Sequence, residues 1–537
     1  MRYTARYVGK SRGMGTTVPA PLRSQGASFP APIGGWDAYS PISAMPQQNA
    51  VELVNWYPQP GYVELRRGYV TQCDTGTDAE VDTIMAYQGP LVSDQRLFAA
   101  SGGNIWDVTS STPTSIGSGF GSNRWQYVNF ATSGGNFLWM CNGSDAPRYW
   151  NGTTLQTATI TGVTAANMIQ CTIYRGRIWA VLNNSTKAAY LPLDSIQGAA
   201  TVFDVGPYFK MGGQLQAIGT WSTDVQGGTN EFIVFVSSYG EVAIFLIYDP
   251  NDSSGFSFRG VSTIGSPIGR RCIERIGSDM AIITIDGVLP LSAVLNYDRA
   301  AVQQAALTKN IRNAMVQAAR DYQDNFGWQV ISYPKNTMAI INVPISEGGQ
   351  QQQYVMNTIN GAWARFTGQD ANCWCVFQDR LYFGGNDGVV YLADEAAGDE
   401  NQTMTADIQG AYNYFGSQGQ NKRWTTLRPL VQQETSYQIT LEVGLSIDFQ
   451  LNENLDELLV DNPTPPAIWD DPNTIWDDPN TKWPGLVTSQ RWMAVSGIGY
   501  CAAVRMRVSV EWTESLRTAQ TLRIYSFDTL FDLGAFI

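Results

Sequence analysis

The amino-acid sequence predicts a mainly β protein: a β-propeller of six or seven blades, an additional C-terminal β domain and one helical insertion. Two features of the whole chain support this. Its 537 residues are too many for one ordinary domain unless the chain is repetitive. It is also rich in glycine and aromatic residues, with only 15% charged residues, which favours strands joined by tight turns. A recurring hairpin pattern supplies the third observation.

The recurring pattern is an apolar strand, a short turn with Gly, Asn or Asp, and an aromatic-rich second strand. It occurs seven times between residues 83 and 394, and RLFAASGGNIWDV from Arg96 closely resembles RLYFGGNDGVVYLAD from Arg380. Extra short strands such as TIMAYQ, MIQCTIY and CWCVFQ precede several copies. Three to four strands in about 45 residues is the period of a propeller blade. A pair of large β-sandwiches is the alternative, because it also spaces strands regularly.

The predicted propeller, residues 81–405, has a different kind of segment on each side. Residues 1–80 are expected to form a basic N-terminal arm followed by strands, and residues 406–537 a C-terminal β domain. Within the propeller, residues 296–325 are rich in Ala and Gln, and their apolar side chains recur at helical spacing. We expect this insertion to pack on the ring; contact with a neighbouring subunit is the alternative.

The composition excludes several kinds of enzyme. The chain has no histidine, so Ser-His-Asp and Cys-His catalytic pairs and histidine-containing metal sites are absent. Its seven cysteines show no CxxC spacing, which indicates buried free thiols in a reducing cytosol: Cys73, Cys141, Cys171, Cys272, Cys373, Cys375 and Cys501. No run approaches the roughly 20 apolar residues of a membrane span. The sequence therefore predicts a protein that is not an enzyme and has no cofactor, metal or membrane span.

The formal net charge of −13 is unevenly distributed. Residues 1–36 contain no acidic residue, and their basic residues are Arg2, Arg6, Lys10, Arg12 and Arg23. The acidic remainder lacks the clustered Lys and Arg side chains with which proteins grip a DNA duplex. The arm is a candidate contact for phosphate or for an acidic adaptor subunit; the alternative is that its charge has no role.

The segment IWDDPNTIWDDPNTKW, residues 468–483, repeats one seven-residue unit. It lies in a proline-rich connection, residues 452–490, which cannot be a regular strand or helix. Loops of this length are usually functional or disordered. We expect the tryptophans to anchor the loop on a partner or on its own domain, with the Asp pairs as solvated spacers. The candidate contact residues are Trp469, Trp476, Trp483, Asp470, Asp471, Asp477 and Asp478. Calcium binding is the alternative, although the EF-hand spacing is absent.

Three stretches of the chain resemble the tail nozzle proteins of short-tailed bacteriophages, also called tail hub or packaged-DNA stabilisation proteins. NAVELVNWYPQPGYVELRRGYVTQ is similar to the family's N-terminal Asn-x-x-Pro…Arg-x-Gly strand. LTKNIRNAM, followed by GWQVISYPKNTMAIINVP and QYVMNTINGAWARFTG, is similar to the family's Tyr-Pro, apolar strand and Tyr-Val-x-Asn…Trp closing strand. The third stretch is the Trp-Asp loop ahead of a last strand ending LRIYSFDTLFDL.

The resemblance implies a structural virion protein in the phage tail, assembled in the host cytoplasm. Six copies would form the distal nozzle ring of a portal–adaptor–nozzle complex, conduct and retain genomic DNA for ejection, and dock tail fibre or spike proteins. An acidic wall repels DNA weakly everywhere, so a duplex can slide along it without sticking. The alternatives are a carbohydrate-binding or carbohydrate-cleaving host-surface propeller, and a propeller with a general interaction role.

Overall fold

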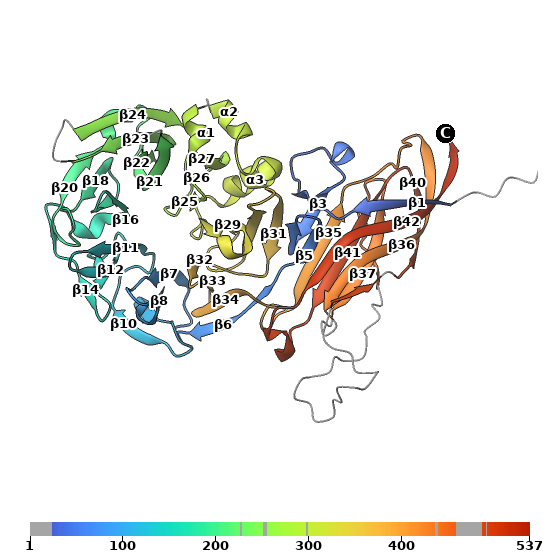
Figure 1. The fold of residues 1–537 in the computed structure, drawn as a ribbon, viewed down its shortest axis with the longest axis horizontal. Coiled ribbons are helices and arrows are strands. Elements are labelled where there is room, and N and C mark those ends of the chain that lie inside the picture. Colours follow the sequence, from blue (N-terminus) through green and yellow to red (C-terminus); the bar gives the residue numbers. More distant parts are fainter. Residues whose placement is uncertain are drawn as a thin grey trace, which may run out of the picture.

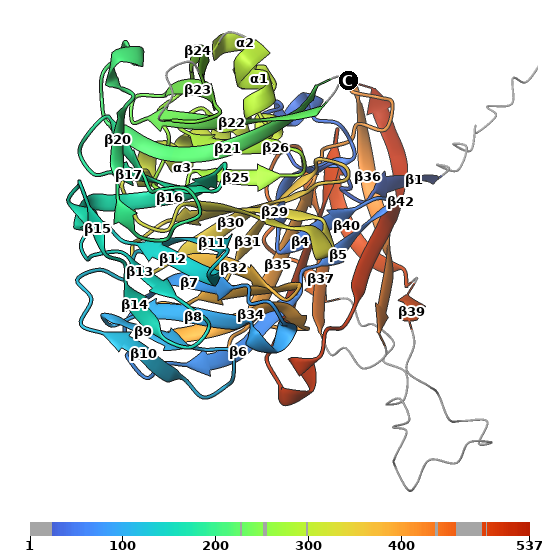
Figure 2. The ribbon, with the colours of Figure 1, turned by 60° about the vertical axis from the view of Figure 1, so that its left-hand side comes forward.

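The computed structural model describes residues 24–225, 228–250, 255–296, 299–434, 439–457, 486–489 and 491–536. Figure 1 shows a ring of sheets with a β-sandwich beside it, and Figure 2 shows the sandwich along one side of the ring. The prediction of a mainly β protein with a propeller and an additional C-terminal β domain is therefore confirmed.

Within the described residues the ring has seven blades, since the innermost strand of each sheet contacts that of the next and β32 returns to β7. The seven hairpins found in the sequence are the second and third strands of these blades. The first four blades each have four antiparallel strands: β7 (Val81–Tyr87), β8 (Arg96–Ser101), β9 (Asn104–Asp107), β10 (Thr114–Ser118); β11 (Gln126–Thr132), β12 (Gly135–Cys141), β13 (Arg148–Trp150), β14 (Leu155–Thr157); β16 (Met168–Tyr174), β17 (Arg177–Leu182), β18 (Lys187–Tyr190), β20 (Thr201–Asp204); β21 (Leu215–Val225), β22 (Gly228–Ser237), β23 (Glu241–Ile247), β24 (Phe256–Thr263). A short parallel pair, β15 (Ile160–Thr161) and β19 (Gly198–Ala199), lies beside the third blade.

The last three blades depart from this pattern in ways that tie the ring together. They contain β25 (Ile273–Ile276), β26 (Asp279–Thr284), β27 (Gly287–Pro290); β28 (Gln329–Tyr333), β29 (Met338–Pro344), β30 (Gln351–Asn357), β31 (Trp363–Thr367); β32 (Cys373–Phe377), β33 (Arg380–Gly384), β34 (Val389–Ala396). The outermost strand of the seventh blade is β6 (Gly68–Asp74), which precedes the whole propeller in sequence and pairs antiparallel with β34. This pairing closes the ring, because neighbouring blades otherwise meet through their faces alone.

The sandwich consists of two sheets packed face to face around a shared core. One sheet contains β1 (Gln25–Pro30), β4 (Trp56–Gln59), β5 (Tyr62–Leu65), β36 (Gln420–Glu434), β39 (Leu486–Ser489), β40 (Met493–Gly499) and β42 (Leu522–Phe536). The other contains β2 (Gly35–Trp36), β3 (Asn49–Val54), β35 (Met404–Gly410), β37 (Thr440–Ile447), β38 (Asp456–Glu457) and β41 (Ala502–Val510). Strands from both ends of the chain therefore build this domain together.

The N-terminal segment, residues 1–80, is divided between the two domains. Strands β1 to β5 belong to the sandwich, and β6 belongs to the propeller. Phe29 on β1 is buried, with its ring centroid 4.9 Å from that of Phe415. The acid-free stretch of residues 1–36 is therefore not all arm: from Gln25 onward it is part of the folded sandwich.

The helical insertion is present as α1 (Leu291–Asn296), α2 (Arg299–Gln304) and α3 (Arg312–Tyr322). On α3, Met315, Ala318 and Ala319 are buried in the main hydrophobic core, as their helical spacing predicts. Arg320, on the opposite side, is exposed. The insertion therefore packs on the protein's own core, which agrees with the first of the two interpretations of this segment.

One continuous sheet joins the propeller to the sandwich. The sixth blade's outer strand, β31, pairs with β2 and β3, so blade and sandwich sheet form a single ten-stranded sheet. At the crossing, Gly35 has φ +82°, and a Cβ there would lie 2.6 Å from the backbone nitrogen and oxygen of Trp363. Only glycine allows the two backbones to approach this closely.

A buried ion pair clamps the two places where the chain passes between domains. Arg66 lies between β5 and β6, and Asp399 lies between β34 and β35. Arg66 Nη1 and Nη2 donate to the two Asp399 carboxylate oxygens at 2.8 and 2.6 Å, with both side chains almost fully buried. The other Arg66 donor bonds go to Asn55 Oδ1 and to the carbonyls of Arg67 and Thr367. All five guanidinium N–H groups therefore have acceptors, as a buried arginine requires.

Asn55 and Gly68 complete the clamp. Asn55 adopts φ 58°, and its Nδ2 donates to Thr367 Oγ1 and to the Thr405 carbonyl, so it joins the propeller strand β31 to the sandwich strand β35. A Cβ at Gly68 would overlap the Gly398 carbonyl, which shows how closely the two connecting chains pass.

We expect Arg66→Met to lower the free energy of unfolding by about 3–5 kcal/mol, because it leaves the Asp399 carboxylate buried without its cation. The measurement is the urea midpoint of unfolding. Lys335→Met is the matched control: its 3.7 Å pair with Glu395 is exposed, and such pairs contribute less than about 1 kcal/mol. The double variant Arg66→Met, Asp399→Leu should be more stable than Arg66→Met. Equal midpoints for Arg66→Met and the control would contradict the clamp.

Candidate functional site: the propeller channel and its mouth

The innermost strands of the ring surround a narrow polar channel. It holds a cavity of about 310 Å³, whose polar lining includes Thr83, Gln126, Gln170, Glu274 and Gln329. These residues lie on or next to β7, β11, β16, β25 and β28, and Cys373 and Trp374 on β32 also line the cavity, so six of the blades contribute to it. Polar side chains from most of the ring therefore meet along its axis.

Amide side chains connect neighbouring blades along this channel. Gln170 donates from Nε2 to the Ile218 carbonyl at 2.9 Å and accepts from the Ile218 N–H at 3.0 Å. Gln329 makes the same two bonds with Trp374, both at 2.9 Å. Among the described residues, the innermost strands of neighbouring blades share no ladder beyond an isolated bridge between Arg271 and Gln329, and each amide supplies a donor and an acceptor to the neighbouring backbone. These glutamines therefore have a structural role.

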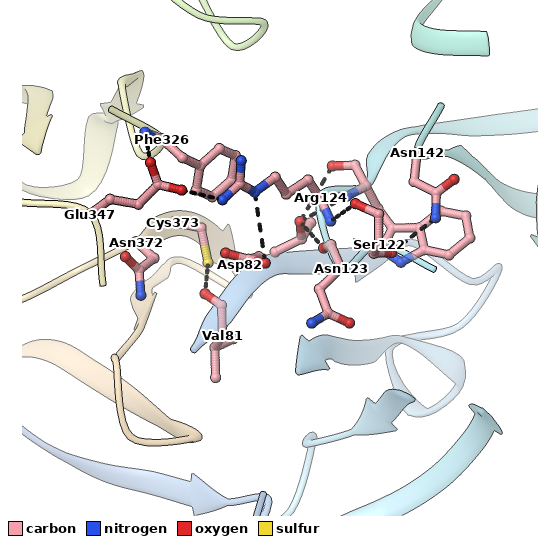
Figure 3. Close-up of polar contacts among 12 residues, drawn as sticks. Val81, Asp82, Ser122, Asn123, Arg124, Asn142, Phe326, Glu347, Asn372 and Cys373 are labelled. Carbon is pink, nitrogen blue, oxygen red and sulfur yellow. Dashed lines mark hydrogen bonds and ion pairs between the residues drawn. The ribbon is translucent and has the colours of Figure 1, made fainter. Parts of the chain in front are cut away.

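A cluster of charged residues lies at one end of the channel, and Figure 3 shows its contacts. Arg124, just before β11, forms an ion pair with Glu347 and lies 4.0 Å from Asp82. The Arg124 guanidinium is 4.0 Å from the centroid of the Phe326 ring, and the Phe326 N–H donates to Glu347 at 3.2 Å. Burial raises the pKa of Asp82 to about 6, although Arg124 and Arg271 both oppose this shift.

Arg271 crosses the channel. It lies two residues before β25, yet its Nη2 donates to the Asp82 carbonyl and to Thr83 Oγ1 of β7, both at 2.8 Å. Strands β25 and β7 are not neighbours in the ring, so this side chain spans the opening. Its guanidinium lies 5.1 Å from the Phe326 ring centroid, and its buried Nη1 has no partner among the described residues.

Above this cluster lies a larger cavity of about 720 Å³, which we call the mouth. Arg124, Arg270 and Arg271 line it. Burial lowers the pKa of the Arg270 guanidinium, and the charge of Arg124 lowers it further. Within the described part of the chain, Arg270 has no hydrogen bond or ion pair. The mouth therefore contains cationic donors that are not used by the fold.

The structure assigns no position to the contact residues predicted from the sequence. The following all lie outside the described residues, so no contact is assigned to them: Trp469, Trp476, Trp483, Asp470, Asp471, Asp477, Asp478, Arg2, Arg6, Lys10, Arg12 and Arg23. No motif in the sequence singles out Arg124, Arg270, Arg271 or Phe326. The one available signal was the adjacent pair Arg270 and Arg271; their meeting with Arg124 depends on closure of the ring.

The cysteines do not form a reactive centre. All seven are free and buried, as the sequence analysis predicts. Burial raises the pKa of Cys272 and of Cys373 to about 12, so neither is a thiolate at neutral pH. Among the described residues, no three His, Cys, Asp or Glu side chains come together as metal ligands. In the same residues, no helix has the length and apolar character needed to cross a membrane.

Comparisons with known proteins find resemblance at the level of structure. No family model and no curated protein matches the chain. One similar structure is the extracellular domain of a putative hybrid two-component system from B. thetaiotaomicron. The match covers 63% of this chain and 45% of that chain, at 10% sequence identity and TM-score 0.40. Another is BBS1N in complex with ARL6DN. The match covers 61% of this chain and 97% of that chain, at 10% sequence identity and TM-score 0.38. A third is Sqt1 of Saccharomyces cerevisiae. The match covers 61% of this chain and 99% of the Sqt1 chain, at 12% sequence identity and TM-score 0.34. These scores carry no functional argument.

We expect Glu274→Gln to weaken the pH dependence of stability. Burial in the channel raises the pKa of Glu274 to about 7 from its usual 4.5. A carboxyl group with a raised pKa stabilises the fold below the usual pKa, and this contribution is lost as the pH rises through the folded-state value. The melting temperature of the variant relative to the wild type should therefore increase from about pH 5 to about pH 8. A difference in melting temperature between variant and wild type that stays the same from pH 5 to pH 8 would contradict the assignment.

Proposed function

We propose that this protein is a structural virion protein, a subunit of the distal tail nozzle ring of a short-tailed bacteriophage. The observation that carries the proposal is spatial: the described parts of the stretches that resemble the nozzle family contact one another, with the first stretch touching both the second and the last strand near the junction between propeller and sandwich. Residues that are far apart in the chain, but similar to one family, therefore take part in joining the two domains.

The contacts between these stretches are direct. In the first stretch, Asn55 and Arg66 form the clamp. Asn357 of the second stretch donates from Nδ2 to the Pro58 carbonyl of the first at 2.9 Å. Arg523 of the last strand donates from Nε to Glu64 of the first at 3.0 Å. The motif residues therefore favour a shared domain arrangement with the family.

A ring subunit needs domains that keep a fixed relation to each other. The ten-stranded sheet and the buried clamp supply this, because any hinge between the domains would break backbone hydrogen bonds and expose an ion pair. In the proposed ring, DNA passes between the copies along the ring axis and not through a propeller, since Arg271 spans the propeller channel. The acidic net charge suits such a wall.

The first test of the proposal is the arrangement of the chain in a native particle. A reconstruction should place six copies around the tail axis below the portal and adaptor proteins, with fibres or spikes outside. Mass photometry of the purified chain with its adaptor should show species well above the 59.0 kDa monomer. A monomer that is absent from the tail would overturn the proposal.

We expect deletion of residues 1–23 to impair assembly onto the adaptor while leaving the subunit folded. The deletion ends before β1, so the pairing of β1 with β42 is preserved. Deletion of residues 1–36 should instead lower the melting temperature, because it removes β1 and β2 from their sheets. Thermal melting and co-sedimentation with the adaptor measure the two effects. Normal assembly of the shorter deletion would contradict a contact role for the arm.

We expect Trp476→Ala to weaken docking of a neighbouring subunit or fibre by about ten-fold or more, as loss of a buried aromatic anchor does. The melting temperature of the isolated subunit should stay unchanged. Co-sedimentation with the ring or fibre and thermal melting provide the measurements. An equal loss in melting temperature would mean that Trp476 packs only within its own domain.

Carbohydrate binding at a host surface is the second candidate function, and the polar mouth is the observation that favours it. Cleavage would need a carboxylate pair in a pocket, whereas Asp324 is the single acidic side chain in the described lining of the mouth. A glycan array incubated with the purified chain tests this candidate. Absence of binding would remove it.

A further inference from the structure

We propose that the mouth of the propeller channel binds an oxyanion, the carboxylate or phosphate group of a small hydroxyl-bearing molecule, through Arg270 and Arg271. This inference is independent of the nozzle proposal, because it concerns one subunit's cavity and not its assembly.

Unused donors are the first argument. Arg270 lines the mouth without a hydrogen bond or ion pair among the described residues. Arg271 lines both the mouth and the channel cavity, and its buried Nη1 has no partner among the described residues. A buried guanidinium donor left unpaired is costly, so proteins normally supply an acceptor. Planar guanidinium groups match carboxylate and phosphate oxygens in geometry and charge. An oxyanion in the mouth would pair with the half-buried Arg270 and lie beside Arg271.

Local charge is the second argument. Three guanidinium groups lie close enough that Arg124 lowers the pKa of both Arg270 and Arg271, in addition to the effect of burial. Nearby, Glu347 and Asp82 both face Arg124. Asp324, on the exposed rim, is the acidic member of the lining. Arg270 therefore lacks a counter-ion, and a bound anion would relieve the repulsion among the three cations.

The size and lining of the mouth define the rest of the ligand. A cavity of about 720 Å³ is of the size that holds small molecules. Its walls are hydroxyl and amide side chains, which hydrogen-bond to hydroxyl groups: Ser122, Asn142, Ser144, Asn183, Ser238 and Ser266. Arg271 and Phe326 close the channel below, so a long polymer cannot pass through. The ligand class is therefore a compact anion that carries hydroxyl groups.

Isothermal titration calorimetry of the full chain tests the site with four probes: glucuronate for the carboxylate, glucose 6-phosphate for the phosphate, inorganic phosphate, and neutral glucose. The variant is Arg270→Gln, chosen because Arg270 makes no bond that the fold uses. The matched control is Arg259→Gln, which alters an exposed arginine on the outer strand β24. Melting curves without ligand establish that both variants fold.

The expected result is binding of glucuronate or glucose 6-phosphate, weakened about ten-fold or more by Arg270→Gln and unchanged by Arg259→Gln, since a charge-assisted pair is lost only in the first variant. Glucose should bind at least ten-fold more weakly. The anionic sugar that binds more tightly identifies the anion class, and inorganic phosphate shows whether the anion alone suffices. The proposal is overturned if neither anionic sugar binds, if glucose binds equally well, or if Arg270→Gln keeps wild-type affinity. Arg270→Lys, which retains charge but not the planar fork, should show intermediate affinity.

Discussion

The architecture depends on the Arg66–Asp399 ion pair, because it lies where the chain crosses between its two domains. The polypeptide leaves the sandwich at Arg66, builds the whole propeller, and returns at Asp399. A bidentate pair at this point holds together the first and last strands of the propeller excursion, β6 and β34, which themselves pair to close the ring. Ring closure and domain placement therefore share one set of contacts.

This arrangement gives a physical meaning to the sequence motif around residues 55–68. Asn55 is needed because its side chain reaches both domains from a left-handed backbone conformation that asparagine tolerates. Arg66 is needed because lysine could not donate five hydrogen bonds to converging acceptors. Gly68 is needed because the returning chain leaves no room for a side chain. A resemblance based on these residues therefore concerns how two β domains are joined.

The sequence could predict the repeating part of the fold but not the contacts that join it. Each blade's middle hairpin is local, with alternating apolar residues and a turn, so all seven could be found from spacing. The pairing of β31 with β2 and β3 joins residues more than three hundred positions apart, and nothing in either stretch specifies the other. The mouth was missed for the same reason: Arg124 and Arg271 come from different blades and meet only when the ring closes.

Arg271 has one role in the closed channel and another at the open mouth. Arg271 uses one nitrogen to bind β7 across the channel, so the fold itself fixes the position of this cation. Its other terminal nitrogen is buried without a partner among the described residues, and Arg271 also lines the mouth beside Arg270. A residue fixed by the ring on one side is well placed to bind a ligand on the other, since little side-chain entropy remains to be lost. The rigidity that suits the proposed structural role would thus also preorganise the proposed anion site.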